Sequence, residues 1–130
     1  MKLLPDTPVL LWWLNDDEKL SATARQLIKT VDNAIYVSHV SLWEIQIKVM
    51  AGKLRADLET IIKQLPENSF QQFPLHANPI LALAKLPKHH QDPFDRMLIA
   101  QAGSEPLHLI PMINRSHYTV KAAFLFNHFK

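Results

Sequence analysis

The stretch MKLLPDTPVLLWWL (residues 1–14) decides how this chain begins to fold. It joins a short apolar run to a longer one through the polar turn PDTP at residues 5–8. Proline is favoured in the first turn of a helix, and an aspartate or threonine before it can cap the free N–H groups there. The stretch therefore predicts a strand that enters a helix, with Asp6 or Thr7 near the N-cap and Pro8 close to the first helical position.

The same alternation of short apolar runs and helical patterns continues outward from this stretch. Further strands are expected at residues 34–37, 70–75 and 107–110, and further helices at residues 21–30, 41–50, 57–65, 76–86 and 92–103. The tail from residue 114 to 130 is weakly patterned and is expected to be helix or coil. Short strands that alternate with helices pair in parallel through right-handed crossovers. One α/β sandwich domain over residues 1–130 is therefore expected, with its site beyond the carboxyl ends of the strands.

The composition excludes several classes of protein. A hydrophobic content of 48% in 130 residues suits one globular domain with one core. The apolar runs fall far short of the roughly 20 residues that cross a membrane, and no secretory leader is recognised. The absence of cysteine removes disulfides and thiolate metal sites, and it fits a cytoplasmic location. The net charge of +2 permits a polyanionic partner without requiring one.

Three acidic residues stand where a strand or loop enters a predicted helix, and each has a purely structural explanation. Asp6 could simply cap the first helix. Glu44 completes the capping-box pattern Ser41-x-x-Glu44 and is also spaced to pair with Lys48. Asp95 lies in the first turn after an Asp-Pro cap, where the helix dipole favours an anion.

Together the three acids suggest a metal site. A parallel sheet can bring Asp6, Glu44 and Asp95 to one edge, where clustered carboxylates repel one another unless a cation neutralises them. Mg²⁺ prefers hard oxygen ligands and needs only one or two carboxylates directly. Such an ion can activate water as a nucleophile and stabilise charge on a phosphoryl group. Arg96, and less strongly Lys48, are expected to face the phosphates of a substrate from the rim of this site.

Four motifs, taken in order, resemble those of the PIN-domain nucleases, and within them the VapC-like toxins of type II toxin–antitoxin pairs. They are MKLLPDTPVLLWWL at residues 1–14, VSHVSLWEI at 37–45, GKL at 52–54 and DPFDRMLIAQA at 92–102. The resemblance covers residues 1–110, and residues 111–130 diverge from it. It implies a PIN-like three-layer α/β/α sandwich with a short, mainly parallel central sheet.

The resemblance implies a Mg²⁺- or Mn²⁺-dependent endoribonuclease. Its partners would be an RNA substrate, a cognate antitoxin protein that blocks the site, and a second copy of the toxin in a homodimer. Residue by residue, the acids of the family match Asp6, Glu44 and Asp95 in this sequence. Thr7 and Ser41 match small hydroxyl positions beside these acids, where they would orient the carboxylates.

The chain departs from the family pattern at three positions. Pro5 stands where an apolar residue is usual, and a proline in a central strand removes a ladder hydrogen bond. Pro8 stands where histidine is frequent. Ile113 stands where members commonly supply a fourth acid, and Asn114 and Ser116 are the nearest neutral substitutes.

These departures leave two other readings open. One is a PIN scaffold that is weakly active or inactive and binds an antitoxin or RNA without cleavage. The other is a structural dimer module that uses Trp12 and Trp13, one of them in the core and one at an interface. The pair His89-His90 is predicted to lie in a solvated loop and not in a metal site, because adjacent residues seldom converge on one ion.

Overall fold

The centre of the molecule is a sheet whose strands are β1 (Lys2–Pro5), β2 (Ala34–Ser38), β3 (Gln71–Phe73), β4 (His108–Ile110) and β5 (Val120–Lys121). The computed structural model describes residues 1–87, 92–105, 107–112 and 120–121. Within these residues the strand order is β3-β2-β1-β4-β5. The first four strands run parallel to their neighbours, and β5 pairs antiparallel with β4. The tail, expected to be helix or coil, thus contributes a short edge strand.

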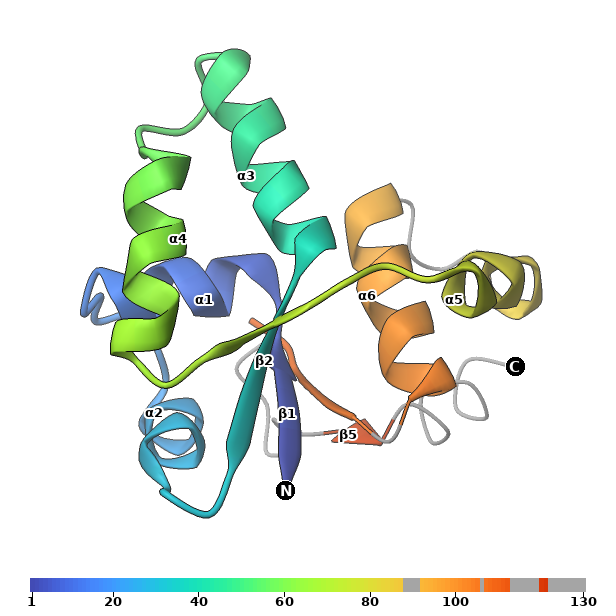
Figure 1. The fold of residues 1–130 in the computed structure, drawn as a ribbon, viewed down its shortest axis with the longest axis horizontal. Coiled ribbons are helices and arrows are strands. Elements are labelled where there is room, and N and C mark those ends of the chain that lie inside the picture. The colour runs from blue at the N-terminus through green and yellow to red at the C-terminus, as the bar shows by residue number, and fades with distance from the viewer. Residues whose placement is uncertain (88–91, 106, 113–119, 122–130) are drawn as a thin grey trace.

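Helices cover both faces of this sheet (Figure 1). They are α1 (Thr7–Leu14), α2 (Ala22–Lys29), α3 (His39–Met50), α4 (Leu58–Glu67), α5 (Ala77–Ala82) and α6 (Pro93–Ser104), with a short 3-10 helix, η1 (Leu83–Lys85). Helices α1, α2 and α4 lie on one side of the sheet, and α5 and α6 lie on the other. The predicted three-layer α/β/α sandwich with a mainly parallel sheet is confirmed.

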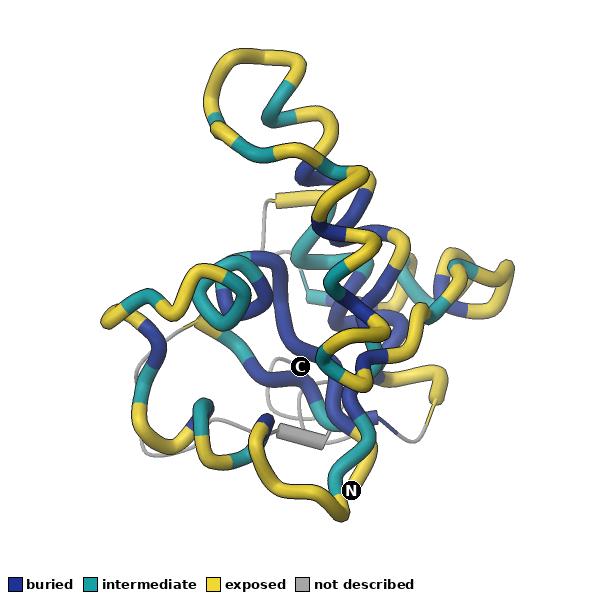
Figure 2. Tube along the Cα trace, turned by 60° about the vertical axis from the view of Figure 1, so that its left-hand side comes forward, coloured by how far each residue is buried: buried dark blue, intermediate teal, exposed yellow. Residues whose placement is uncertain are grey.

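Successive residues of β1 belong to different hydrophobic cores, because side chains alternate between the two faces of a sheet. Leu3 is fully buried in a cluster with residues of α1, α2 and α4. Leu4 is fully buried in a second cluster, with residues of α6 and β4. Both faces of β1 are packed, which explains its continuous apolar run. Figure 2 shows buried positions gathered along the strands, while the far end of α3 and the turn after it are largely exposed.

Most of the predicted helix starts are confirmed. Asp6 is the N-cap of α1 with Pro8 in its first turn, Ser21 caps α2, and Asp92 caps α6. The predicted helix at residues 76–86 is present as α5 followed by η1.

The capping-box explanation of Ser41 and Glu44 is wrong. Helix α3 begins at His39, and its N-cap is Ser38, whose Oγ accepts a hydrogen bond from the N–H of Val40 at 2.9 Å. Ser38 and Ser41 are both residues that can cap a helix, and the earlier one caps α3 because β2 ends there. The Glu44 side chain is therefore not used as a helix cap.

Pro5 lies inside β1 as its last residue, although it was expected to end the strand before it. The N–H of Asp6 donates to the carbonyl of Ile110 on β4 at 2.9 Å. Alternate N–H groups of a strand point to opposite neighbours, so the missing N–H of Pro5 is on the side of β2. The pairing of β1 with β2 covers Lys2 and Leu3 only, and the ladder therefore loses no bond at Pro5.

Pro66 also lies within an element that it was expected to stop. Helix α4 continues to Glu67, because a proline in the last turn removes only one bond of the helical ladder. The chain then turns at Ser69, which has a positive φ of 61°. Among the described helices, none is long and apolar enough to cross a membrane.

Candidate active site

The three predicted acids come together beyond the carboxyl ends of the parallel strands. Asp6 directly follows β1, Glu44 lies in the second turn of α3 after β2, and Asp95 lies in the first turn of α6. The charges of Asp95 and Glu44 both raise the pKa of Asp6, which places the three carboxyl groups within electrostatic range of one another. The three acids therefore share the edge of the sheet at which a site was expected.

Two backbone N–H groups hold the Asp6 carboxylate. Oδ1 accepts from the N–H of Val9 at 2.9 Å, and Oδ2 accepts from the N–H of Met112, just after β4, at 2.7 Å. Burial raises the pKa of Asp6 to about 7, opposed by these two hydrogen bonds and assisted by Asp95 and Glu44. The carboxylate is thus fixed in direction and costly to ionise in the absence of a cation.

Glu44 is held by hydroxyl groups as well as by its own helix. Its Oε1 lies 2.6 Å from the Thr7 hydroxyl oxygen, which in turn lies 3.0 Å from the hydroxyl oxygen of Ser41. A hydroxyl group can donate only one hydrogen bond, and an ionised carboxylate can only accept. Thr7 therefore donates to Glu44 and accepts a hydrogen bond from the Ser41 hydroxyl. All three side chains are buried. The two hydroxyl residues predicted beside the acids therefore contact Glu44 directly or through each other.

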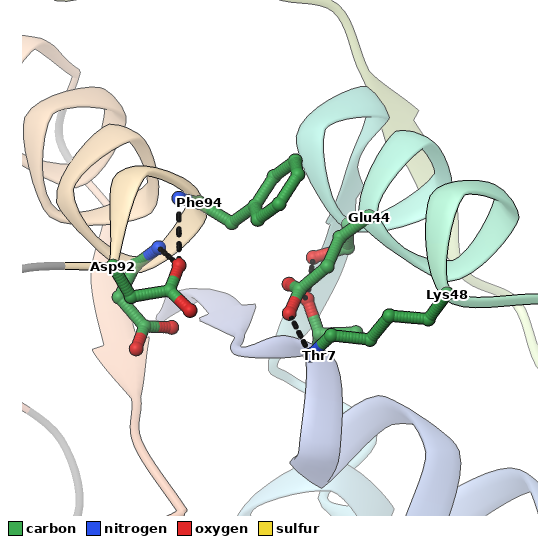
Figure 3. Close-up of polar contacts among 7 residues, drawn as sticks. Thr7, Glu44, Lys48, Asp92 and Phe94 are labelled. Atoms are coloured by element: carbon green, nitrogen blue, oxygen red, sulfur yellow. Dashed lines mark hydrogen bonds and ion pairs between the residues drawn. The ribbon is translucent and has the colours of Figure 1, made fainter. Parts of the chain in front are cut away.

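Lys48 supplies the opposite charge. Its Nζ lies 2.5 Å from Glu44 Oε2, one turn along α3. Figure 3 shows Glu44 and Lys48 beside Thr7, with Phe94 of α6 and Asp92, the N-cap of that helix, facing them. The hydrogen bond to Glu44 raises the pKa of Lys48, and the charges of Glu44 and Asp92 raise it further, against the effect of burial. Lys48 therefore remains protonated, bonded to Glu44 and close to the charges of Asp92 and Asp95.

Asp95 is half-buried at the start of α6. The carboxylate of the N-cap, Asp92, accepts from the N–H groups of Phe94 at 2.8 Å and of Asp95 at 3.1 Å, which sets the direction of this helix. Burial, together with the charges of Asp92 and Glu44, raises the pKa of Asp95 to about 6, while Lys48 lowers it. The second aspartate, like the first, lies where added positive charge would favour its ionised form.

A pocket opens beside Asp6 and Asp95. Its other walls are apolar and come from α6, from β4 and from the segment after β4. The lining residues are Asp6, Asp95, Leu98, Ile99, Leu109, Pro111 and Met112. Glu44 is not among them. The pocket therefore presents two carboxylates on a largely apolar surface, whereas the carboxylate of Glu44 is buried and bonded to the Thr7 hydroxyl and the Lys48 ammonium group.

Arg96 lies next to Asp95 in sequence, but its guanidinium group contacts backbone. It donates to the carbonyl of Pro87 at 2.8 Å and to that of Leu83 at 3.2 Å. These bonds connect α6 to the start of η1 and to the segment that follows it. Its expected role at the substrate rim stays a prediction.

Both tryptophans of α1 are partly buried and pack against the larger hydrophobic cluster, and the expectation that one of them serves an interface stays a prediction. Trp13 also donates from Nε1 to Asn68 at 3.0 Å. The residues expected to replace or lack a fourth acid, Ile113, Asn114 and Ser116, and the pair His89-His90, lie outside the described residues.

The contribution of Met112 was missed in the sequence. It acts through its backbone N–H, and a main-chain donor has no signature in a pattern of side chains. Only the placement of the segment after β4 beside β1 reveals that this N–H points at Asp6.

The donor set fits a hard divalent cation. Asp6 and Asp95 offer carboxylate oxygens whose pKa values are raised, chiefly by burial and further by the negative charges around them. Across the described ranges, no group of three His, Cys, Asp or Glu side chains is close enough to enclose an ion. An ion here would therefore be held by the two aspartates, with water in its remaining positions, as is usual for Mg²⁺.

A comparison with protein families matches residues 3–119 of the chain to the PIN domain. No curated protein matches the sequence significantly. The family match agrees with the parallel sheet and its helical layers. Because the match spans most of its 130 residues, this chain belongs to the PIN domain family, whose members are generally nucleases that act on nucleic acids with divalent metal ions.

Proposed function

We propose that this protein is a Mg²⁺-dependent endoribonuclease, able to use Mn²⁺, and that it is a VapC-like toxin of a type II toxin–antitoxin pair. The observation that carries the proposal is the convergence of Asp6, Glu44 and Asp95 at one edge of the sheet, with mutual charge effects. The motifs at residues 1–14, 37–45, 52–54 and 92–102 support the toxin branch.

Asp6 and Asp95 would hold the metal ion. When bound, the ion supplies an activated water and stabilises charge on the phosphate. The two N–H groups that bind Asp6 keep its carboxylate aimed in one direction, so little reorganisation is needed at the moment of reaction. Glu44, steadied by Thr7 and Ser41, would either ligate a second ion or position the attacking water.

The proposed partners are RNA, a cognate antitoxin protein and a second copy of the chain. The exposed apolar side chains of α3 support a protein partner: Trp43 is 58% exposed, Ile47 39% and Met50 79%. These residues are spaced to lie on one face of a helix. Exposed apolar surface of this kind is typical of protein–protein contacts.

The decisive experiment is RNA cleavage by the purified chain in Mg²⁺, with EDTA as a control. Asp6→Asn is expected to lower the cleavage rate about 100-fold or more, since a bound ion contributes several kcal/mol of transition-state stabilisation. Asp32→Asn, the same change at an exposed turn, is the matched control and should cleave normally. Circular dichroism should show both variants folded.

Expression in a bacterial host tests the biological role. The wild-type chain should arrest growth, Asp6→Asn should not, and co-expression of the antitoxin should restore growth. Growth arrest that survives Asp6→Asn contradicts the proposed site. Absence of Mg²⁺-dependent cleavage by a well-folded wild-type chain favours the non-catalytic scaffold instead.

A further inference from the structure

We propose that the Lys48 ammonium group neutralises the Glu44 carboxylate, so that the site binds one divalent ion, between Asp6 and Asp95, and not two. This inference rests on the proposed metal-dependent function and refines it. It assigns the two positive charges of the site to different sources, one to a metal ion and one to the protein.

Both oxygens of Glu44 already have partners in the protein. Oε1 faces the Thr7 hydroxyl at 2.6 Å, and Oε2 faces the Lys48 ammonium group at 2.5 Å. The Glu44 side chain is only 4% exposed, so water can do little to support its charge. A buried carboxylate in this position requires a cation, and Lys48 is that cation.

The shape of the site agrees with this division. The pocket is lined by Asp6 and Asp95 but not by Glu44. Among the described residues, the acids also do not form a compact three-ligand group. An ion that enters the pocket therefore meets two carboxylates first, while the third is covered by its own helix and by Thr7.

Lys48 also acts on the other acids. Its ammonium group is close enough to Asp92 and Asp95 to interact with their charges. Its ammonium group thus lies in the field that would attract a second dication, and it repels one. At 44% exposed, the Lys48 side chain is also accessible to a phosphate group of a bound strand.

Calorimetric titration with MnCl₂, at a pH well above the pKa of Asp6, tests the inference on the full chain. The wild type is expected to bind one Mn²⁺ per chain. Glu44→Gln should leave that number unchanged. Lys48→Met should gain a second Mn²⁺, because the Glu44 carboxylate then lacks a cation, and Lys48→Met with Glu44→Gln should return to one. Lys63→Met, at an exposed position of α4, is the matched control and should behave as the wild type.

Two bound ions in the wild type, loss of an ion in Glu44→Gln, or an unchanged count in a folded Lys48→Met would each overturn the inference. If Lys48→Met does not fold, the wild-type count and the Glu44→Gln count still decide it. RNA cleavage is measured on the same samples, which separates the two proposals. Cleavage with two bound ions rejects only the role of Lys48, whereas one bound ion without cleavage rejects the nuclease.

Discussion

Asp6 combines three roles in one side chain. It caps α1 through Val9, it accepts a hydrogen bond from the N–H of Met112 in the segment after the neighbouring strand β4, and it lines the pocket. A surface cap would ionise easily, but burial raises the pKa of this carboxyl group from 3.8 to about 7. The same residue therefore opposes stability when it is charged and provides a strong ligand when a cation is present.

The pH dependence of stability follows from this shift. Between about pH 4 and about pH 7, the native state keeps a proton on Asp6 that the unfolded state has lost, so stability must fall as the pH rises. From about pH 5 to about pH 8 in EDTA, the wild type should lose roughly 2 to 3 kcal/mol more than Asp6→Asn. Urea unfolding at the two pH values measures this, with Asp32→Asn as a control that should follow the wild type.

Added Mn²⁺ should reverse the loss above about pH 7, because an ion that binds only the native state stabilises it. Asp6→Asn should show little of this rescue. Equal slopes with pH in the wild type and Asp6→Asn would show that the Asp6 carboxyl group is not the source of the effect.

At the scale of elements, a buried hydrogen-bonded joint between Ser38 and Gln101 connects α3 to α6. The hydroxyl of Ser38, the cap of α3, donates to the side-chain oxygen of Gln101 on α6, and the Gln101 amide reaches the carbonyl of Pro74 at 3.4 Å. Ser38 and Gln101 are both fully buried. Since α3 carries Glu44 and α6 carries Asp95, this joint fixes the two helices that bring the acids together.

Loss of the joint should be costlier than loss of an ordinary cap. Ser38→Ala removes a cap, worth about 1 kcal/mol, and leaves the buried oxygen of Gln101 without its donor, worth about 1 to 3 kcal/mol more. Ser21→Ala, at the N-cap of α2, removes only a cap and is the matched control. Urea denaturation should show the larger loss for Ser38→Ala. Similar losses in the two variants would mean that the link to Gln101 adds nothing.

At the scale of the whole molecule, the exposed side of α3 is a candidate surface for self-association. Ile47 and Met50 lie on the same helix as the Glu44–Lys48 pair but point into solvent. Ile47→Lys with Met50→Lys should therefore shift the proposed homodimer to monomer without unfolding it. Sedimentation velocity over a range of concentrations measures the change. Val31→Lys, at an isolated apolar residue that is 95% exposed, should leave the dimer intact, and a dimer that tolerates both changes to α3 uses another surface.

Much of this architecture could be predicted from the sequence because its signals are local. The PDTP turn predicts a strand followed by a capped helix, and Asp92-Pro93 does the same for α6. At α3 the local signal was misleading, because Ser41-x-x-Glu44 fits a capping box, whereas the N-cap is Ser38 at the end of β2. The three acids were singled out by their place in the PIN-like motifs, and the parallel strands explain why they lie at one edge.

The sequence by itself thus determined most of the elements, their parallel arrangement and which acids are candidates for the site. Only the tertiary structure decided how those acids are used. It brings the N–H of Met112 to Asp6 across 106 positions of the chain, and it turns Glu44 toward Thr7 and Lys48 instead of toward its own helix start. Strand and helix signals act over a few residues, whereas the solvation and charge of a carboxylate depend on every segment packed around it. That packing exists only in the folded chain.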